Sequence, residues 1–148
     1  MVSNYKIFKT IAIVLGIIIF FWLIYDYQNS IGKVNQNYIE ANNNFLKKNY
    51  LKALDLYRKV SELEPNNLYA LEGEARCLMR LQNHNEALEI FKLVLKRDKN
   101  FVPALTNIAI LYDTIEDYEK AIIYYRKAIQ QDQRLLNSMS WFIWFIRS

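Results

Sequence analysis

The chain has 148 residues, 53% of them hydrophobic, and a formal net charge of +4. This length fits one domain of ordinary size, and with only 3 glycines and 2 prolines an architecture of strands and tight turns is poorly supported. Beyond the first 25 residues basic and acidic side chains nearly balance, which excludes the strongly basic face of a nucleic-acid-binding domain. The single cysteine excludes an intrachain disulfide and a cysteine-based zinc site.

The first predicted element is a membrane anchor. An uncharged run, TIAIVLGIIIFFWLIY, extends from Thr10 to Tyr25. Together with Ile7, Phe8 and the aliphatic stem of Lys9 it makes a helix of about 28 Å, enough to cross the hydrocarbon core of a bilayer. We therefore expect an anchor over residues 1–28, with its span at about 7–25, and a short linker over residues 29–33.

A cleaved signal peptide is the alternative interpretation of the same run. Ser30 and Gly32 are small residues two apart, which faintly resembles a cleavage site. The apolar run is long for a signal peptide and rich in bulky aromatic residues, so its length favours an anchor that stays attached.

The rest of the chain repeats itself every 34 residues. The segments ALDLYRKV, ALEIFKLV and AIIYYRKA begin at Ala53, Ala87 and Ala121. Three further columns keep this spacing, namely Ala41, Ala75 and Ala109; Tyr57, Phe91 and Tyr125; and Tyr50, His84 and Tyr118. Each unit predicts two helices of about 13 residues, A and B, joined by a polar turn, and stacked units share one core.

A helical hairpin of this length with these columns resembles the tetratricopeptide repeat family. If Pro65 is the closing proline of the first repeat, the repeats cover residues 34–67, 68–101 and 102–135, with Lys99 and Gln133 in place of the later prolines. The resemblance implies an all-α fold: a right-handed α-solenoid of three hairpins that follows the transmembrane helix.

No cluster of residues suited to catalysis is visible. His84 is the only histidine, and it stands in a column that holds tyrosine in the other repeats, while Cys77 falls inside a predicted helix. Neither residue has a partner of the type that a nucleophile or metal site requires, and no glycine-rich phosphate loop is present. We therefore expect that the protein is not an enzyme and that it binds neither a cofactor nor a metal ion.

The resemblance instead implies partner binding along the helices A. By their positions in the repeats, the residues expected to face a peptide segment or protein subunit are Tyr38, Asn42, Phe45, Tyr69, Glu72, Arg76, Met79, Arg80, Thr106, Ile110 and Asp113. The members of the family that bind chaperone tails use a lysine–asparagine–asparagine–lysine–arginine clamp. The matching positions here are Tyr38, Asn42, Gly73, Pro103 and Asn107, of which only Asn42 agrees, so we do not expect that subtype.

The layout of one anchor and three repeats is similar, more specifically, to the membrane-anchored tetratricopeptide proteins of cyanobacteria and red-algal plastids linked to photosystem I assembly. That resemblance implies a scaffold for a membrane complex in the thylakoid membrane. The alternative is a bacterial inner-membrane scaffold for envelope or secretion assembly. Both interpretations expect a protein partner and a membrane, and neither expects nucleic acid.

The last predicted element is an apolar helix over residues 136–148 that caps the third repeat. Its packing stripe is Met139, Phe142, Ile143 and Ile146. A second stripe of Trp141, Trp144 and Phe145 makes the helix apolar nearly all round, which is typical of a buried helix. We expect this second stripe to dock on the membrane interface or on a membrane partner; a chain end that simply exposes a core-type helix is the alternative.

Overall fold

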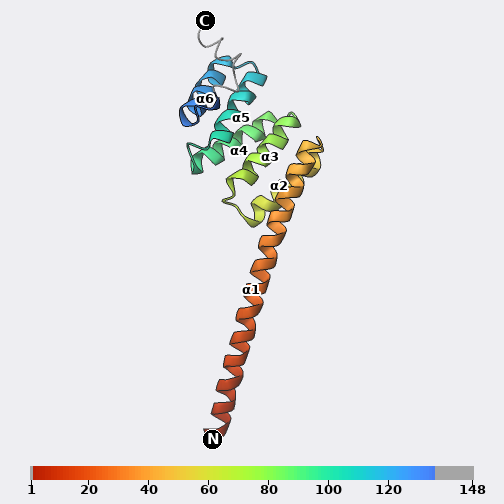
Figure 1. The fold of residues 1–148 in the computed structure, drawn as a ribbon, viewed down its shortest axis with the longest axis vertical. Coiled ribbons are helices and arrows are strands. Elements are labelled where there is room, and N and C mark those ends of the chain that lie inside the picture. Colours follow the sequence, from red (N-terminus) through yellow and green to blue (C-terminus); the bar gives the residue numbers. More distant parts are fainter. Residues whose placement is uncertain (1, 136–148) are drawn as a thin grey trace. The chain divides into compact units, whose positions relative to one another are not determined.

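The computed structural model describes residues 2–135 and places only helices and short turns in that range. The helices are α1 (Val2–Leu46), α2 (Tyr50–Leu63), α3 (Leu68–Arg80), α4 (His84–Arg97), α5 (Val102–Thr114) and α6 (Tyr118–Gln131) (Figure 1). The expected all-α class is confirmed. The chain forms two compact units, one up to Gln36 and one from Asn37. The predicted capping helix over residues 136–148 lies outside the described residues.

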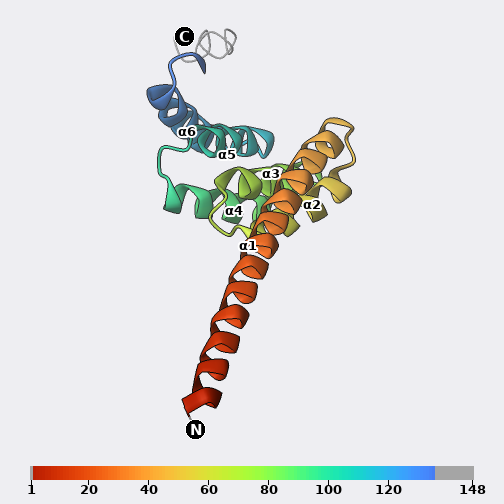
Figure 2. The same cartoon turned by 60° about the horizontal axis from the view of Figure 1, so that its bottom comes forward.

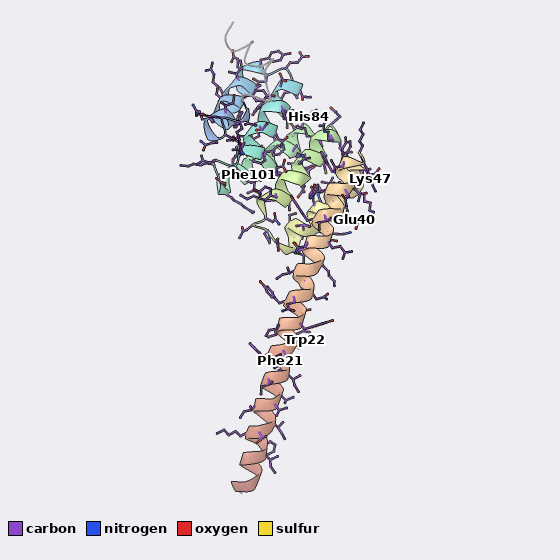
Figure 3. The ribbon with its side chains drawn as sticks, viewed as in Figure 1. Phe21, Trp22, Glu40, Lys47, His84 and Phe101 are labelled. Atoms are coloured by element: carbon purple, nitrogen blue, oxygen red, sulfur yellow. The ribbon has the colours of Figure 1, made fainter. Side chains whose placement is uncertain are left out.

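In the first unit, α1 carries the apolar run. The mean hydropathy of its most apolar 18-residue window is 2.6, and none of that window is buried. Phe21 and Trp22 are 63% and 61% exposed, and Figure 3 shows both side chains projecting outward from the helix. By length and composition α1 could cross a membrane, and it is the one helix in the described range of which this holds.

The linker expected at residues 29–33 is not a break in the helix. α1 continues through it without interruption as far as Leu46. The segment contains no proline, and its one glycine, Gly32, has open space around the position of a Cβ atom. One glycine weakens a helix only slightly, whereas a proline would remove a hydrogen bond and clash, so nothing in this stretch ends α1.

In the second unit the helices stack in chain order. α3 packs on α4 and α5 on α6, α2 packs on α3 and α4 on α5, and α3 also contacts α5 (Figures 1 and 2). α3 and α5 begin at Leu68 and Val102, where the 34-residue period starts the second and third repeats. The last turns of α1 therefore form helix A of the first repeat, and α3 and α5 are the helices A of the second and third repeats. The helices B are α2, α4 and α6.

The repeated columns form the core of this unit. The two alanine columns are between 0% and 2% exposed, and the aromatic column of Tyr57, Phe91 and Tyr125 is between 0% and 3% exposed. Small side chains let neighbouring helices approach closely, and one ring from each helix B fills the space beside them.

The turns between helices A and B share one backbone conformation. Lys48, Gln82 and Glu116 each have φ at 63°, in the left-handed region. In each turn the following amide N–H donates to a carbonyl five residues earlier, as Asn83 does to Leu78 over 2.9 Å. These bonds satisfy carbonyl groups at the end of each helix A, so the turn is held by the backbone.

Candidate functional site

Nine of the predicted binding residues lie on the three helices A, and the contacts described below link these helices. We call these nine residues the helix A face: Tyr38, Asn42 and Phe45 on α1, Tyr69, Arg76 and Arg80 on α3, and Thr106, Ile110 and Asp113 on α5. Two contacts join its three helices. The Arg76 guanidinium carbon lies 4.2 Å from the centroid of the Phe45 ring, and the side chains of α3 and α5 meet through Glu72 and Asn107.

The first part of this face is an aromatic cluster. Tyr38 and Tyr57 meet edge to face with ring centroids 5.9 Å apart, and the Tyr57 hydroxyl donates to Asn42 Oδ1 over 2.6 Å. Tyr57 is 1% exposed, and this burial raises the pKa of its hydroxyl far above the usual range. Tyr57 therefore stays neutral and holds the amide of Asn42 in place.

At the centre of the face lies a buried carboxylate. Glu72 is 6% exposed; its Oε1 accepts from Asn107 Nδ2 over 2.7 Å, and its Oε2 lies 3.5 Å from Arg76 Nη1. Burial raises the pKa of Glu72, while the charge of Arg76 and the hydrogen bonds of Arg76 and Asn107 act in the opposite direction. Arg76 thus serves two groups at once, the Glu72 carboxylate and the Phe45 ring.

Two predicted contact residues are less accessible than expected. Glu72 and Met79 are 6% and 8% exposed, so they form the floor of the helix A face and offer a partner little surface. The family resemblance implied, from their positions in the repeat, that they contact a partner, but α3 is covered by α2, α4 and α5 and therefore buries most of its circumference. Tyr69 and Ile110, by contrast, are 59% and 38% exposed.

A surface hollow of about 290 Å³ lies at one end of the helix A face. Met79, Arg80 and Ile110 line it, as expected of contact residues, together with Tyr50, Gln82, His84 and Thr114. Tyr50, Gln82 and His84 were not predicted as contact residues. Tyr50 and His84 belong to one repeat column at the start of each helix B, and that column was the available signal.

His84, labelled in Figure 3, is the first residue of α4, and it also lines this hollow. Its Nε2 lies 3.0 Å from Gln82 Oε1, and its Nδ1 is buried with no hydrogen-bond partner among the described atoms. Arg80 is exposed and forms no ion pair within residues 2–135. The hollow thus offers an apolar floor, a guanidinium and an amide.

The helix A face lacks the chemistry of a carboxylate clamp. Asn42 Oδ1 is engaged by Tyr57, and Asn107 Nδ2 donates both to Glu72 and to the Pro103 carbonyl. A terminal carboxylate placed beside Asn107 would also meet the Glu72 carboxylate. The structure thus gives a physical reason why Asn107 does not hold a terminal carboxylate: its Nδ2 already donates twice, and the Glu72 carboxylate lies beside it.

Cys77 does not suit nucleophilic chemistry. Its side chain is fully buried, and burial raises the pKa of its thiol to about 12, so the thiolate is scarce at neutral pH. Within the part of the chain that the structure describes, no group of His, Cys, Asp and Glu is placed to hold a metal ion. The predicted docking residues Trp141, Trp144 and Phe145 lie outside the described residues.

Comparison with known proteins agrees with this architecture. Two family models described as tetratricopeptide repeat match residues 45–109 and 102–134, which together make up more than half of the chain. A search of curated proteins found no match.

Solved structures of similar fold include three tetratricopeptide domains. The TPR2B domain of yeast Sti1, in a pHsp70 complex, has a TM-score of 0.65 and 22% identity, over 73% of this chain and 86% of the other. The Sgt2 domain from Aspergillus fumigatus has a TM-score of 0.63 and 25% identity, over 68% and 66%. The first repeat domain of Spaghetti (RPAP3), bound to the HSP90 peptide SRMEEVD, has a TM-score of 0.66 and 18% identity, over 78% and 94%. The period, the stacked hairpins and the two family models together establish that the chain belongs to the tetratricopeptide repeat family.

Proposed function

We propose that the protein is a membrane-anchored interaction scaffold whose helix A face binds a peptide segment or subunit of a membrane complex. The observation that carries this proposal is the surface itself. It joins exposed aromatic and apolar side chains to Arg80 beside a hollow of about 290 Å³. Aromatic and arginine side chains around a pocket are the usual anchors of protein interfaces.

We take the partner to be a protein segment because the chain belongs to the tetratricopeptide repeat family. Tetratricopeptide repeats mediate protein–protein interaction, and two of the solved structures above hold Hsp70 or Hsp90 ligands. A chaperone tail is not the ligand that we propose here, because only Asn42 of the five clamp positions agrees and the Glu72 carboxylate beside Asn107 would repel a terminal carboxylate.

Site-specific crosslinking tests the helix A face. A photoreactive residue at Tyr69 or Ile110, in the full-length protein in its native membrane, should crosslink to one and the same partner. Ile123 on α6 is the matched control, because it is 51% exposed but lies on a helix B. Crosslinking to that partner from Ile123 alone would place the binding surface on the other helices and contradict the proposal.

Membrane anchoring is the second part of the proposal, and the exposed apolar side chains of α1 support it. Burial of such side chains in lipid contributes roughly 1.5–3 kcal/mol each, so an inserted α1 would not leave the bilayer. Alkaline carbonate should therefore leave the full-length protein in the membrane pellet. Its release into the supernatant would show that α1 does not span the bilayer.

The finer proposal is assembly or stabilisation of photosystem I in a thylakoid membrane, supported by the layout of one apolar N-terminal helix and repeats in a chain of this size. Comigration with photosystem I or with one of its assembly intermediates on a native gel would agree with it. Comigration with an envelope or secretion complex would instead favour the bacterial inner-membrane scaffold.

A further inference from the structure

A second hollow, of about 350 Å³, lies away from the helix A face. It is bounded by the end of α4, the turn before α5 and the last turns of α6. Leu95, Leu105 and Tyr124 supply apolar side chains to it. None of its lining residues belongs to the set expected to bind the partner, so the proposed function makes no use of this site.

The polar lining of this hollow is one-sided. Two of its lining residues, Lys99 and Lys127, carry ammonium groups, and Asn100, Gln130 and Gln131 carry carboxamides, whereas none of the described residues that line it is an aspartate or glutamate. Carboxamides both donate and accept hydrogen bonds, whereas ammonium groups only donate. The hollow therefore has a surplus of donors and of positive charge.

The two lysines of this hollow are also uncompensated. Lys127 Nζ lies 5.0 Å from the centroid of the Tyr124 ring, and neither it nor Lys99 forms an ion pair between residues 2 and 135. Lys92, on the neighbouring α4, pairs with Glu89 over 2.9 Å. The positive charge at this hollow is thus not neutralised by the repeat domain itself.

The repeat period explains why this junction is open. At the preceding junction the Arg97 guanidinium donates to the carbonyl of Pro65 and bridges α4 to the turn before α3. One period later, Gln131 stands in the place of Arg97 and Lys99 in the place of Pro65. The shorter Gln131 side chain makes no such bridge in the described structure, and a hollow remains.

We propose that this hollow is a second interaction site, which binds an acidic side chain of a partner protein segment. The carboxylate would lie between Lys99 and Lys127, and Leu95 and Tyr124 would pack against its aliphatic stem or an adjacent apolar residue. The carboxamides would serve the segment's backbone, since peptide N–H and C=O groups need acceptors and donors side by side. A lipid headgroup, which presents chiefly acceptors, would leave the carboxamide oxygens of the hollow without donors, whereas the N–H groups of a peptide supply them.

The test uses the full-length protein in nanodiscs of phosphatidylcholine and a fluorescent peptide of alternating Glu and Leu. Replacing Lys99→Gln and Lys127→Gln together should weaken peptide binding about tenfold or more, about 1.4 kcal/mol. Replacing Lys47→Gln and Arg126→Gln removes the same charge elsewhere on exposed positions and should change binding less than about twofold. A Gln–Leu peptide should bind neither form.

A single variant separates a defined site from general attraction. Gln131→Arg adds positive charge but restores the arginine that closes the preceding junction. If the hollow is the site, binding of the Glu–Leu peptide weakens although the net charge rises, and the unfolding temperature does not fall.

Tighter binding by Gln131→Arg, equal weakening by the two double variants, or no peptide binding by the natural protein would each overturn the proposal. So would binding of soluble dihexanoyl phosphatidylglycerol that needs the same two lysines while the peptide does not bind, because the occupant would then be a lipid. An intact helix A face is not required, so Arg80→Ala should leave peptide binding unchanged. Peptide binding therefore tests only the second site, and the crosslinking experiment tests only the helix A face, so either proposal can fail without the other.

Discussion

The ring of Tyr57 lies directly against Gly73, where α2 crosses α3. A Cβ atom at position 73 would be 2.5 Å from both Cε1 and Cζ of that ring, well inside van der Waals contact. The ring has little freedom to move, because its hydroxyl donates to Asn42 over 2.6 Å. The absence of a side chain at Gly73 therefore sets how closely the first and second repeats approach.

Gly73→Ala should destabilise the repeat domain by about 1–3 kcal/mol, because overpacking at a fixed ring exceeds the gain of up to about 1 kcal/mol in helix propensity. Thermal unfolding of the full-length protein in detergent, followed by circular dichroism, measures this change. Gly32→Ala is the matched control, since nothing lies within 4 Å of its added Cβ, and it should not destabilise. Adding Tyr57→Leu to Gly73→Ala should cost less than the sum of the two single changes; strict additivity would argue against the contact.

Glu72 should make stability fall as pH rises. Burial raises its pKa in the folded state, so the folded protein holds this proton more firmly than the unfolded chain. Protonation of Glu72 contributes its full stabilisation below the pKa that the residue has in the unfolded chain. This contribution is lost as the pH rises through the higher pKa of the folded state.

Glu72→Gln should remove this part of the pH dependence while its amide oxygen still accepts from Asn107. Between pH 4 and neutrality the natural protein should lose more stability than the variant, because only the natural protein has the raised pKa. Denaturant unfolding at a series of pH values tests this, and Glu119→Gln, an exposed position on α6, controls for the loss of one charge. Parallel pH profiles for the natural protein and Glu72→Gln would contradict the prediction.

Arg76 and Arg80 should behave differently although both belong to the helix A face. Arg76→Ala uncovers the Phe45 ring and leaves the buried Glu72 carboxylate without its cation, so we expect a loss of about 1–3 kcal/mol in stability. Arg80→Ala removes an exposed side chain and should change stability by less than about 0.5 kcal/mol while weakening partner binding. Unfolding and crosslinking measurements on both variants test whether Arg76 acts in stability and Arg80 in binding. Equal losses of stability in the two variants would contradict this.

The left-handed turn residues offer a way to stabilise the fold. A non-glycine residue in this conformation costs roughly 1 kcal/mol, so Gln82→Gly should raise the free energy of unfolding by about 0.5–1 kcal/mol. Gln82→Ala keeps a Cβ atom and is the control that should bring no such gain. If Gln82→Gly lowered the stability instead, the contact of the Gln82 side chain with His84 would contribute more than the relief of the left-handed backbone conformation.

The sequence predicts the stacking of this fold well because the period is strict. The alanine columns indicate where helices cross, and α3 and α5 begin at Leu68 and Val102, where the period places them. Local pattern could not show that α1 runs through residues 29–33, since the polar residues there suit a linker as well as a helix. In the structure these residues are exposed, so the absence of a proline, and not tertiary packing, lets the helix continue.

The candidate site was predictable only in part. The family resemblance placed Glu72 and Met79 among the contact residues by their repeat positions, but their burial depends on three helices packing around α3. The hollow beside Lys99 depends on a missing bridge between Gln131 and the turn before α5, which only a comparison of junctions in three dimensions reveals.

The stacking order of the helices also bears on how the chain is made. Among α2 to α6, each helix packs on its sequence neighbours, and the most distant pairing is α3 with α5. Contacts that are short in sequence close small loops, which favours rapid folding. Each helix hairpin can dock on the preceding one as it leaves the ribosome, so the part of the repeat domain already synthesised need not wait for α6 before it hides its apolar surface from other nascent chains.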